Sequence, residues 1–360
     1  MIRRPALIAL PSILLVALGA VACSSEDDGG SASGIPTVVV TTSILGDVVA
    51  NVVGDAAEVE VLMPPGVDPH EFELSAAQAA SLQEADAVVA NGLGFEAGMA
   101  DAIDAAEDAG VPVYEVAPDL DPLPLAEGAH DHADDEHAED GTGDEHTEDG
   151  TGDEHAADED DHAGEEATGD EHAGEEEHAD EGELDPHVFT DPARMADGAE
   201  NIAVALGDAV PALDNAEVTE QAAAYAEQLR AADAAVEEQL SAIPEDRRVL
   251  VTNHEVFAYF ADRYGFEVVG TVIPGGTTLS EPSSQELTEL ADTIAELGVP
   301  AIFADATSAT DLADALAEEA GLDVEVVDLY SESLGEPGSG AETYLAMVEA
   351  NATAIADALS

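Results

Sequence analysis

The chain is almost without positive charge. Its 360 residues include no lysine, and its 7 basic residues, all arginine, stand against 82 aspartate and glutamate residues, so the formal net charge is −75. A nucleic-acid-binding protein neutralises a row of phosphates with lysine and arginine. A protein held on anionic lipid by electrostatics needs a basic patch. The composition therefore excludes both classes, and we expect no nucleic-acid partner.

Aromatic residues and cysteine are also scarce. There is no tryptophan, aromatic residues make up 4% of the chain, and there is one cysteine. A single cysteine excludes an intrachain disulfide and a cysteine-based zinc cluster. Hydrophobic residues still make up 45%, so most of the chain can form a core, and that core must consist largely of alanine, valine, leucine and isoleucine.

The cysteine lies at the end of an export signal. Two arginines precede an apolar run, residues 6–21, which ends in the small residues before Cys23. This order is typical of a secretory signal peptide, here residues 1–22. The run contains Pro11 and is short for a membrane span.

Cys23 resembles the acylated cysteine of the bacterial lipoprotein signal, although Ala20 stands where that family usually has leucine. Acylation would attach the protein to the membrane, with residues 23–35 as a flexible tether rich in serine, glycine and aspartate. The alternative is cleavage by ordinary signal peptidase after Ala22. Both interpretations predict an exported, extracytoplasmic protein.

Strands and helices alternate in two stretches. The pattern predicts strands at 37–42, 59–62, 87–90, 113–116, 249–252, 267–271, 301–304 and 324–327, and helices at 43–53, 75–84, 95–109, 192–206, 256–264, 282–297, 310–320 and 341–359. We expect Ser43 to cap the first helix. Such alternation implies parallel βαβ units. A long alanine-rich helix at 217–243 separates the two stretches. The sequence therefore predicts the α/β class, with an N-terminal lobe at 36–212, a rigid connecting helix at 213–243 and a C-terminal lobe at 244–360.

A low-complexity insert interrupts the first lobe. Residues 121–184 contain almost no apolar side chain larger than alanine, and a TGDEH unit recurs at 142–146, 151–155 and 168–172. This composition cannot bury a core, so we predict a disordered loop with a functional role. It holds eight of the 11 histidines: His130, His132, His137, His146, His155, His162, His172 and His178.

The other three histidines follow predicted strands or open predicted helices. His70 lies in the segment PPGVDPHEFE, His187 in DPHVFTDP and His254 in TNHE. Ligands of α/β proteins bind beyond the carboxyl ends of strands, so a site between the lobes could bring the three together. Three imidazoles and a carboxylate suit Zn²⁺, with nickel, copper and iron(II) also compatible. Each ligating histidine should donate its other N–H to a carboxylate or carbonyl.

The segments PPGVDPHEFELS, DPHVFTDPARM and VTNHEVFAYFADRYGF resemble the three signature segments of zinc-binding solute-binding proteins of bacterial ABC importers, the family called cluster A-I or cluster 9. The resemblance covers nearly all of residues 36–360. Members of this family often carry a His- and Asp/Glu-rich loop before the second ligand histidine, where the insert lies here. The family fold has two α/β lobes with the metal site between them.

By position, His70, His187 and His254 correspond to the three histidine ligands of the family. Its manganese and iron members usually have glutamate at the third place, so His254 favours zinc. The fourth ligand is often an aspartate near the C-terminus. Glu332 takes that place here, and Asp328 and a water molecule are the alternatives. The aromatic residue after the second histidine, usually tryptophan, is Phe189, which we expect to form part of the pocket wall.

The resemblance implies that the protein captures Zn²⁺ and delivers it, as a monomer, to a membrane permease with a cytoplasmic ATPase. Mn²⁺ or Fe²⁺ is the nearest alternative cargo. The histidines of the insert would then collect zinc weakly near the main site, or the insert is only a solvated acidic loop. Four protein ligands leave no water to activate, so we expect no enzyme activity and no catalytic residue.

Two other classes remain open from the sequence. A secreted zinc metallohydrolase could also use three histidines and a water, although no HExxH motif is present. An adhesin or passive zinc buffer would depend on the insert rather than on the three separate histidines. The high acidity outside the insert is compatible with a saline habitat or with lineage bias.

Overall fold

The computed structural model describes residues 34–125, 184–307, 311–320 and 324–360. The predicted signal peptide, Cys23, the tether before residue 34 and the eight histidines of the insert lie outside these ranges. In the described part of the chain, no helix combines the length and apolarity needed to cross a bilayer.

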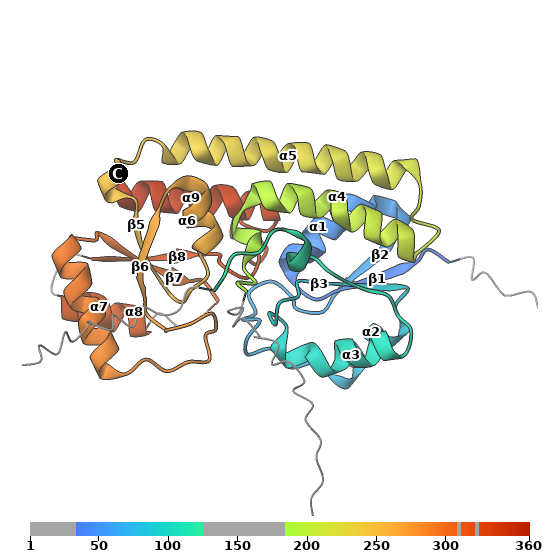
Figure 1. The fold of residues 1–360 in the computed structure, drawn as a ribbon, viewed down its shortest axis with the longest axis horizontal. Helices are drawn as coiled ribbons and strands as arrows, with labels where there is room; N and C mark the ends of the chain where they lie inside the picture. The colour runs from blue at the N-terminus through green and yellow to red at the C-terminus, as the bar shows by residue number, and fades with distance from the viewer. Residues whose placement is uncertain (1–33, 126–183, 308–310, 321–323) are drawn as a thin grey trace, which may run out of the picture. The chain divides into compact units, whose positions relative to one another are not determined.

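Two parallel four-stranded sheets organise the structure (Figure 1). The first has the order β2-β1-β3-β4 and the second the order β6-β5-β7-β8. The strands are β1 (Thr37–Val40), β2 (Glu58–Val61), β3 (Ala87–Ala90), β4 (Val113–Glu115), β5 (Val249–Thr252), β6 (Glu267–Thr271), β7 (Ala301–Asp305) and β8 (Glu325–Leu329). The prediction of two parallel α/β lobes is confirmed.

Helices cover both sheets. Those before the connecting helix are α1 (Ser43–Val53), α2 (Ala76–Glu84), α3 (Ala100–Asp108) and α4 (Pro192–Ala209), and those after it are α6 (Ala258–Tyr264), α7 (Ser284–Leu297), α8 (Asp311–Ala320) and α9 (Tyr344–Leu359). In Figure 1, α2 and α3 lie on the opposite side of the first sheet from α1 and α4. A strand that is covered on both faces consists of consecutive apolar residues, as does the fully buried β3, Ala-Val-Val-Ala.

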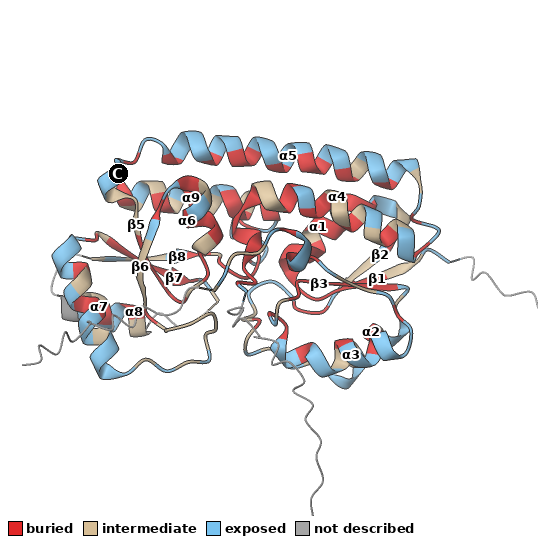
Figure 2. Ribbon diagram, viewed as in Figure 1, coloured by how far each residue is buried: buried red, intermediate tan, exposed pale blue. Residues whose placement is uncertain are grey.

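The connecting helix α5 (Ala216–Leu240) packs against α4, α1 and α9, and so contacts helices of both lobes (Figure 1). Its buried residues recur at helical spacing, including Val218, Ala222, Leu229 and Val236, while the opposite face is exposed (Figure 2). Asn215 caps its first turn by accepting the amides of Glu217 and Val218.

Several element ends differ from the sequence prediction. Helix α3 begins at Ala100, after a separate 3-10 turn at Ala97–Met99, and α4 continues to Ala209. Thr42, not Ser43, caps α1 by accepting the amide of Leu45. The Ser43 hydroxyl is thereby free for contacts with the second lobe, which are described below.

The two ends of the insert lie next to each other. Pro124 and Leu184 form an isolated antiparallel bridge. Within the segment predicted to be disordered, 121–184, residues 121–125 and 184 are thus part of the described structure, and residues 126–183 lie outside it.

Candidate metal centre

Four predicted ligands from different parts of the sequence converge. His70 lies in the turn region after β2, His187 precedes a 3-10 turn at Val188–Thr190, His254 follows β5 and Glu332 follows β8. One ligand atom from each of these residues lies within 4.8 Å of the others. The convergence follows from the topology, because the carboxyl ends of parallel strands are where side chains of separate loops meet.

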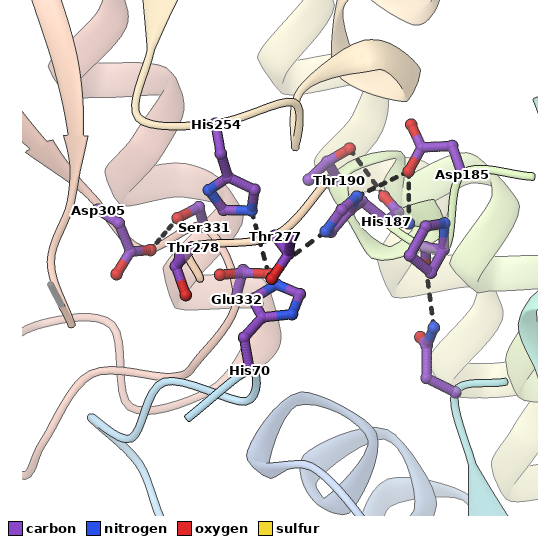
Figure 3. Close-up of polar contacts among 12 residues, drawn as sticks. His70, Asp185, His187, Thr190, His254, Thr277, Thr278, Asp305, Ser331 and Glu332 are labelled. Atoms are coloured by element: carbon purple, nitrogen blue, oxygen red, sulfur yellow. Dashed lines mark hydrogen bonds and ion pairs between the residues drawn. The ribbon is translucent and has the colours of Figure 1, made fainter. Parts of the chain in front are cut away.

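One carboxylate oxygen occupies the centre of this group (Figure 3). Oε1 of Glu332 is 2.8 Å from Nε2 of His70. It is 3.3 Å from Nε2 of His187 and 3.3 Å from Nε2 of His254. The side chains of the last two histidines and of Glu332 are 0% exposed, whereas that of His70 is 7% exposed. Three imidazole nitrogens and one carboxylate oxygen form a donor set that suits a four-coordinate ion.

The group is electrostatically coupled. Burial alone would raise the pKa of Glu332, but attraction to His254 and hydrogen bonds to the histidines hold it well below its usual value. Burial would lower the pKa of His187, yet its hydrogen bonds to Asp185 and Glu332 prevail and raise it to about 9. A cation could replace the proton that this pair of carboxylates attracts.

Two Asp-Pro-His segments position two of the histidines in different ways. Oδ1 of Asp185 accepts the His187 amide at 2.9 Å and contacts ring atom Nδ1 at 2.7 Å, so it orients the imidazole. Oδ1 of Asp68 accepts the His70 amide at 2.8 Å. Its Oδ2 accepts the hydroxyl of Thr278 at 2.9 Å instead.

His254 has no equivalent of Asp185. Within the described ranges, its buried Nδ1 has no hydrogen-bond partner. The expectation that each histidine donates to a carboxylate or carbonyl therefore holds for His187 and is wrong for His254 in this part of the chain. Glu255, the next residue in the chain, donates its amide to the carbonyl of Gly275.

Aromatic rings form one wall of the site. The Phe95 ring contacts His70 and His187 edge-on, with centroid distances of 5.7 Å in both cases. Phe189 packs 5.9 Å from His187 and 5.4 Å from Phe95. Phe189 thus lies where the sequence places a wall residue.

The loop that carries Glu332 forms hydrogen bonds with the first lobe. The Ser43 hydroxyl accepts the amide of Leu334 at 3.0 Å and lies 3.1 Å from the Ser333 hydroxyl. The amide of Gly66, in the turn before His70, lies 2.9 Å from the Ser333 hydroxyl and 3.2 Å from the Leu334 carbonyl. These contacts place Glu332 against two segments of the first lobe.

Asp305 supports the same loop from within the second lobe. Its Oδ2 accepts the hydroxyl of Ser331, and its Oδ1 accepts the amide of Thr307 at 2.7 Å. Burial, followed by repulsion from Glu332, raises the pKa of Asp305. The first contact holds Ser331, the residue next to Glu332, at the end of β7.

A cavity of about 520 Å³ opens onto His70. It is lined from the first lobe by residues that include Leu93, Phe95, Leu125 and Leu184, and from the loop after β6 by Gly276, Thr277 and Leu279. Leu125 and Leu184 are the described residues of the insert next to the undescribed segment 126–183. Of the four converging residues, His70 is the one that lines this cavity.

Asp328, the alternative to Glu332 as fourth ligand, lies outside the group. Asp328 lies in β8 with an exposed side chain and is not a member of the four-residue group. Sequence reasoning missed Thr278, Phe95, Ser43 and Asp305 as neighbours of the site. The repeated Asp-Pro-His motif was a usable signal for Asp68 and Asp185, whereas no local pattern distinguishes Thr278.

Comparisons with known proteins agree with this arrangement. The family model described as "ZnuA: Zinc-uptake complex component A periplasmic" matches residues 38–358. The manganese-binding lipoprotein MntA of Halalkalibacterium halodurans is 29% identical over 97% of both chains. The zinc-binding protein TroA of Treponema pallidum is 29% identical over 92% of this chain and 91% of its own.

A solved structure of the periplasmic zinc-binding protein TroA from Treponema pallidum superimposes with a TM-score of 0.71 and 28% identity, covering 91% of this chain and 100% of that one. The family match over residues 38–358 includes the segments that carry all four converging residues. The chain belongs to the ZnuA family, the metal-binding receptor components of ABC importers.

Proposed function

We propose that this protein captures Zn²⁺ outside the cytoplasm and delivers it to the permease of an ABC importer. His70, His187, His254 and Glu332 are the proposed ligands. The observation that carries the proposal is the buried set of three imidazole nitrogens around one carboxylate oxygen, with all four ligand atoms within 4.8 Å.

The donor set favours zinc over manganese. Manganese prefers oxygen ligands, and zinc is well suited to imidazole nitrogen in a four-coordinate site. A histidine at the third place, His254, supports the same choice. Manganese remains the second candidate, because a relative of nearly the same length is described as manganese-binding.

The further elements of the proposal come from the sequence. Acylation of Cys23 would hold the receptor at the outer face of the membrane, near the permease and its ATPase. The eight histidines between 130 and 178 would bind zinc weakly and raise its local concentration. We propose a monomeric carrier without enzyme activity, since the four side chains can fill the coordination sphere of the ion.

Competition between metals tests the proposal. The mature chain, and a variant in which residues 126–183 are replaced by a short linker, are equilibrated with Zn²⁺ and Mn²⁺ together, and bound metal is measured after removal of weakly held ions. We expect one tightly held zinc in both proteins. His254→Ala should weaken it more than about 100-fold, since loss of a supporting residue alone costs 10- to 100-fold.

Retention of manganese in preference to zinc would assign the second candidate. Loss of tight binding on removal of 126–183 would instead favour a passive buffer. Hydrolysis of ester, phosphate or peptide substrates that depends on the bound ion would favour the metallohydrolase class.

A further inference from the structure

The two Asp-Pro-His segments use their aspartates for different purposes. Both aspartates accept the amide of their own histidine, at 2.8 Å for Asp68 and 2.9 Å for Asp185. Asp185 then contacts the imidazole ring of His187. The second oxygen of Asp68 is directed to Thr278, which lies 210 residues later in the sequence and in the other lobe. The same local motif therefore orients a ring in one case and joins two lobes in the other.

Thr278 belongs to a loop that is fixed to the His254 turn. After β6, the amide of Ile273 donates to the carbonyl of Asn253 at 2.8 Å, and the amide of Glu255 donates to the carbonyl of Gly275 at 3.0 Å. These two bonds hold the loop against the residues on both sides of His254. The hydrogen bond from Thr278 to Asp68 thus connects the turn of His254 with the turn of His70.

This connection lies at the open side of the site. The neighbours of Thr278, Thr277 and Leu279, line the cavity that reaches His70, together with Leu93 and Leu184 of the first lobe. The side chains of His187, His254 and Glu332 are fully buried, whereas that of His70 keeps an exposed fraction of 7%. An ion that leaves the four ligands therefore passes His70 and the loop that holds Thr278.

We infer that the Thr278–Asp68 hydrogen bond is a clasp across the mouth of the site, and that it sets the rate at which the bound ion leaves. This inference rests on the metal-binding function proposed above. Thr278 is a positioning residue: it holds Asp68, which in turn holds the backbone of His70. Loss of the clasp frees the His70 turn to move away from Glu332, and the ion loses its outermost ligand first.

The clasp should affect release more than capture. A partly buried hydrogen bond between a hydroxyl and a carboxylate stabilises the metal-bound state. Its loss should therefore accelerate dissociation of the ion about 5- to 20-fold. The encounter of the ion with the open site does not require the bond to be present. Association should therefore stay within about twofold, because affinity changes among variants of one site reside largely in dissociation.

The test measures zinc release from the full mature chain. Protein loaded with Zn²⁺ is mixed with an excess of a chromogenic chelator, and the slow phase is assigned to the main site by its loss in His254→Ala. We expect Thr278→Val, which keeps the shape but removes the hydroxyl, to accelerate the slow phase about 5- to 20-fold. Thr278→Ser restores the hydroxyl and should release zinc within about twofold of the unaltered protein.

A double-mutant cycle identifies the partner. In an Asp68→Ala background, Thr278→Val should cause no further acceleration, because the two residues act through one bond. The thermal midpoint of the metal-free Thr278→Val protein should fall by no more than about 4 °C, the effect of one hydrogen bond, and a larger fall would indicate a general loss of stability instead of a clasp.

Two results would overturn the clasp while leaving the metal-binding function intact. One is a Thr278→Val protein that releases zinc at the unaltered rate, and the other is equal acceleration by Thr278→Val and Thr278→Ser. If the unaltered protein holds no zinc in a slow phase, the proposed function fails, and the clasp fails with it.

Discussion

At the scale of single residues, His187 is the most constrained of the converging side chains. Its ring lies between Asp185 on one nitrogen and Glu332 on the other, and is fully buried. A pKa near 9 means that the imidazole carries a proton at neutral pH when no metal ion is bound. A metal ion must displace that proton before it can bind Nε2.

This constraint predicts the pH dependence of zinc binding. Below pH 9, His187 is increasingly protonated, so apparent affinity should fall about tenfold for each unit that the pH decreases. Asp185→Asn removes a carboxylate that favours the protonated ring, so the pKa of His187 should fall. The zinc affinity should then level off at a lower pH than it does in the unaltered protein. Zinc titrations with a competing chelator between pH 5.5 and 9.5 measure both profiles.

The same Asp185→Asn variant is expected to bind zinc more weakly at high pH, because the ring is less firmly oriented. The informative quantity is therefore the pH at which each profile levels off, not the affinity itself. Coincident profiles for the two proteins would show that Asp185 does not control the proton on His187.

Motifs in the sequence identify three isolated histidines and Glu332 as candidate ligands, and the structure brings these four residues together. Thr278 could not be found in this way, because threonine is common in loops and its role depends on a contact 210 residues away. The sequence predicts Ser43 as the helix cap in place of Thr42, because the run Thr41-Thr42-Ser43 offers three hydroxyl side chains in a row and a shift of one residue leaves no trace in the pattern.

At the scale of elements, the ends of helices were predicted less well than their existence. The sequence predicts one helix over 95–109. In the structure, Phe95 and Glu96 lie before the 3-10 turn at Ala97–Met99, and helix α3 begins only at Ala100. The Glu96 carboxylate instead accepts the amides of Asn91 and Gly92 and the hydroxyl of Thr41. A buried carboxylate that satisfies a loop is a tertiary interaction, and helical periodicity contains no information about it.

Helix α5 offers a comparison between a buried and an exposed ion pair. Asp233 is largely buried and accepts hydrogen bonds from the guanidinium of Arg263 and from the hydroxyl of Tyr264. Arg230, on the same helix, pairs with Asp197 and Glu200 of α4, and the three side chains are 44–67% exposed. The first set joins α5 to the second lobe and the second joins it to α4.

Removal of the two sets should have unequal effects. Asp233→Ala leaves Arg263 and Tyr264 without their shared acceptor and should lower the free energy of unfolding by about 2–3 kcal/mol. Arg230→Ala, the matched control, should lower it by less than about 1 kcal/mol, because exposed pairs are screened by water. Urea unfolding of the metal-free proteins measures both, and equal losses would contradict the assignment.

At the scale of the whole molecule, the dominant property is charge. A formal charge of −75, with 7 arginines to offset it, makes the folded chain repel itself. Several buried or partly buried carboxyl groups, including Asp47, Glu96 and Asp191, also have raised pKa values because burial disfavours their charged forms. A compact fold also brings acidic side chains closer together than they would be in an extended chain.

This property predicts stabilisation by simple salt. Raising sodium chloride from 0.1 M to 1 M shortens the screening length from about 10 Å to about 3 Å. The repulsion in the folded state should weaken, and the thermal midpoint of the metal-free protein should rise by about 5 °C or more. The few arginine pairs oppose this change only weakly. Differential scanning fluorimetry with a dye insensitive to salt checks the result, and an unchanged or lower midpoint would contradict it.

The two-lobe architecture itself could be predicted from the alternation of strands and helices, because each parallel sheet leaves a local hydrophobic pattern that repeats over a long stretch of the sequence. The position of one lobe against the other could not. It depends on side-chain contacts such as those of Ser43 with the Glu332 loop, and on the packing of α5 against helices of both lobes.

The bridge between Pro124 and Leu184 has a consequence for how this sequence can change over generations. The intervening segment is predicted to be disordered and its two ends meet at one point, so its length should affect the stability of the fold only through loop closure, at about 0.6 kcal/mol for each doubling. Units of the TGDEH type can then be gained or lost by slippage during replication while the ligand geometry is preserved. The acidic histidine segment is thus free to vary in copy number, and related chains should differ there more in length than in any strand or helix.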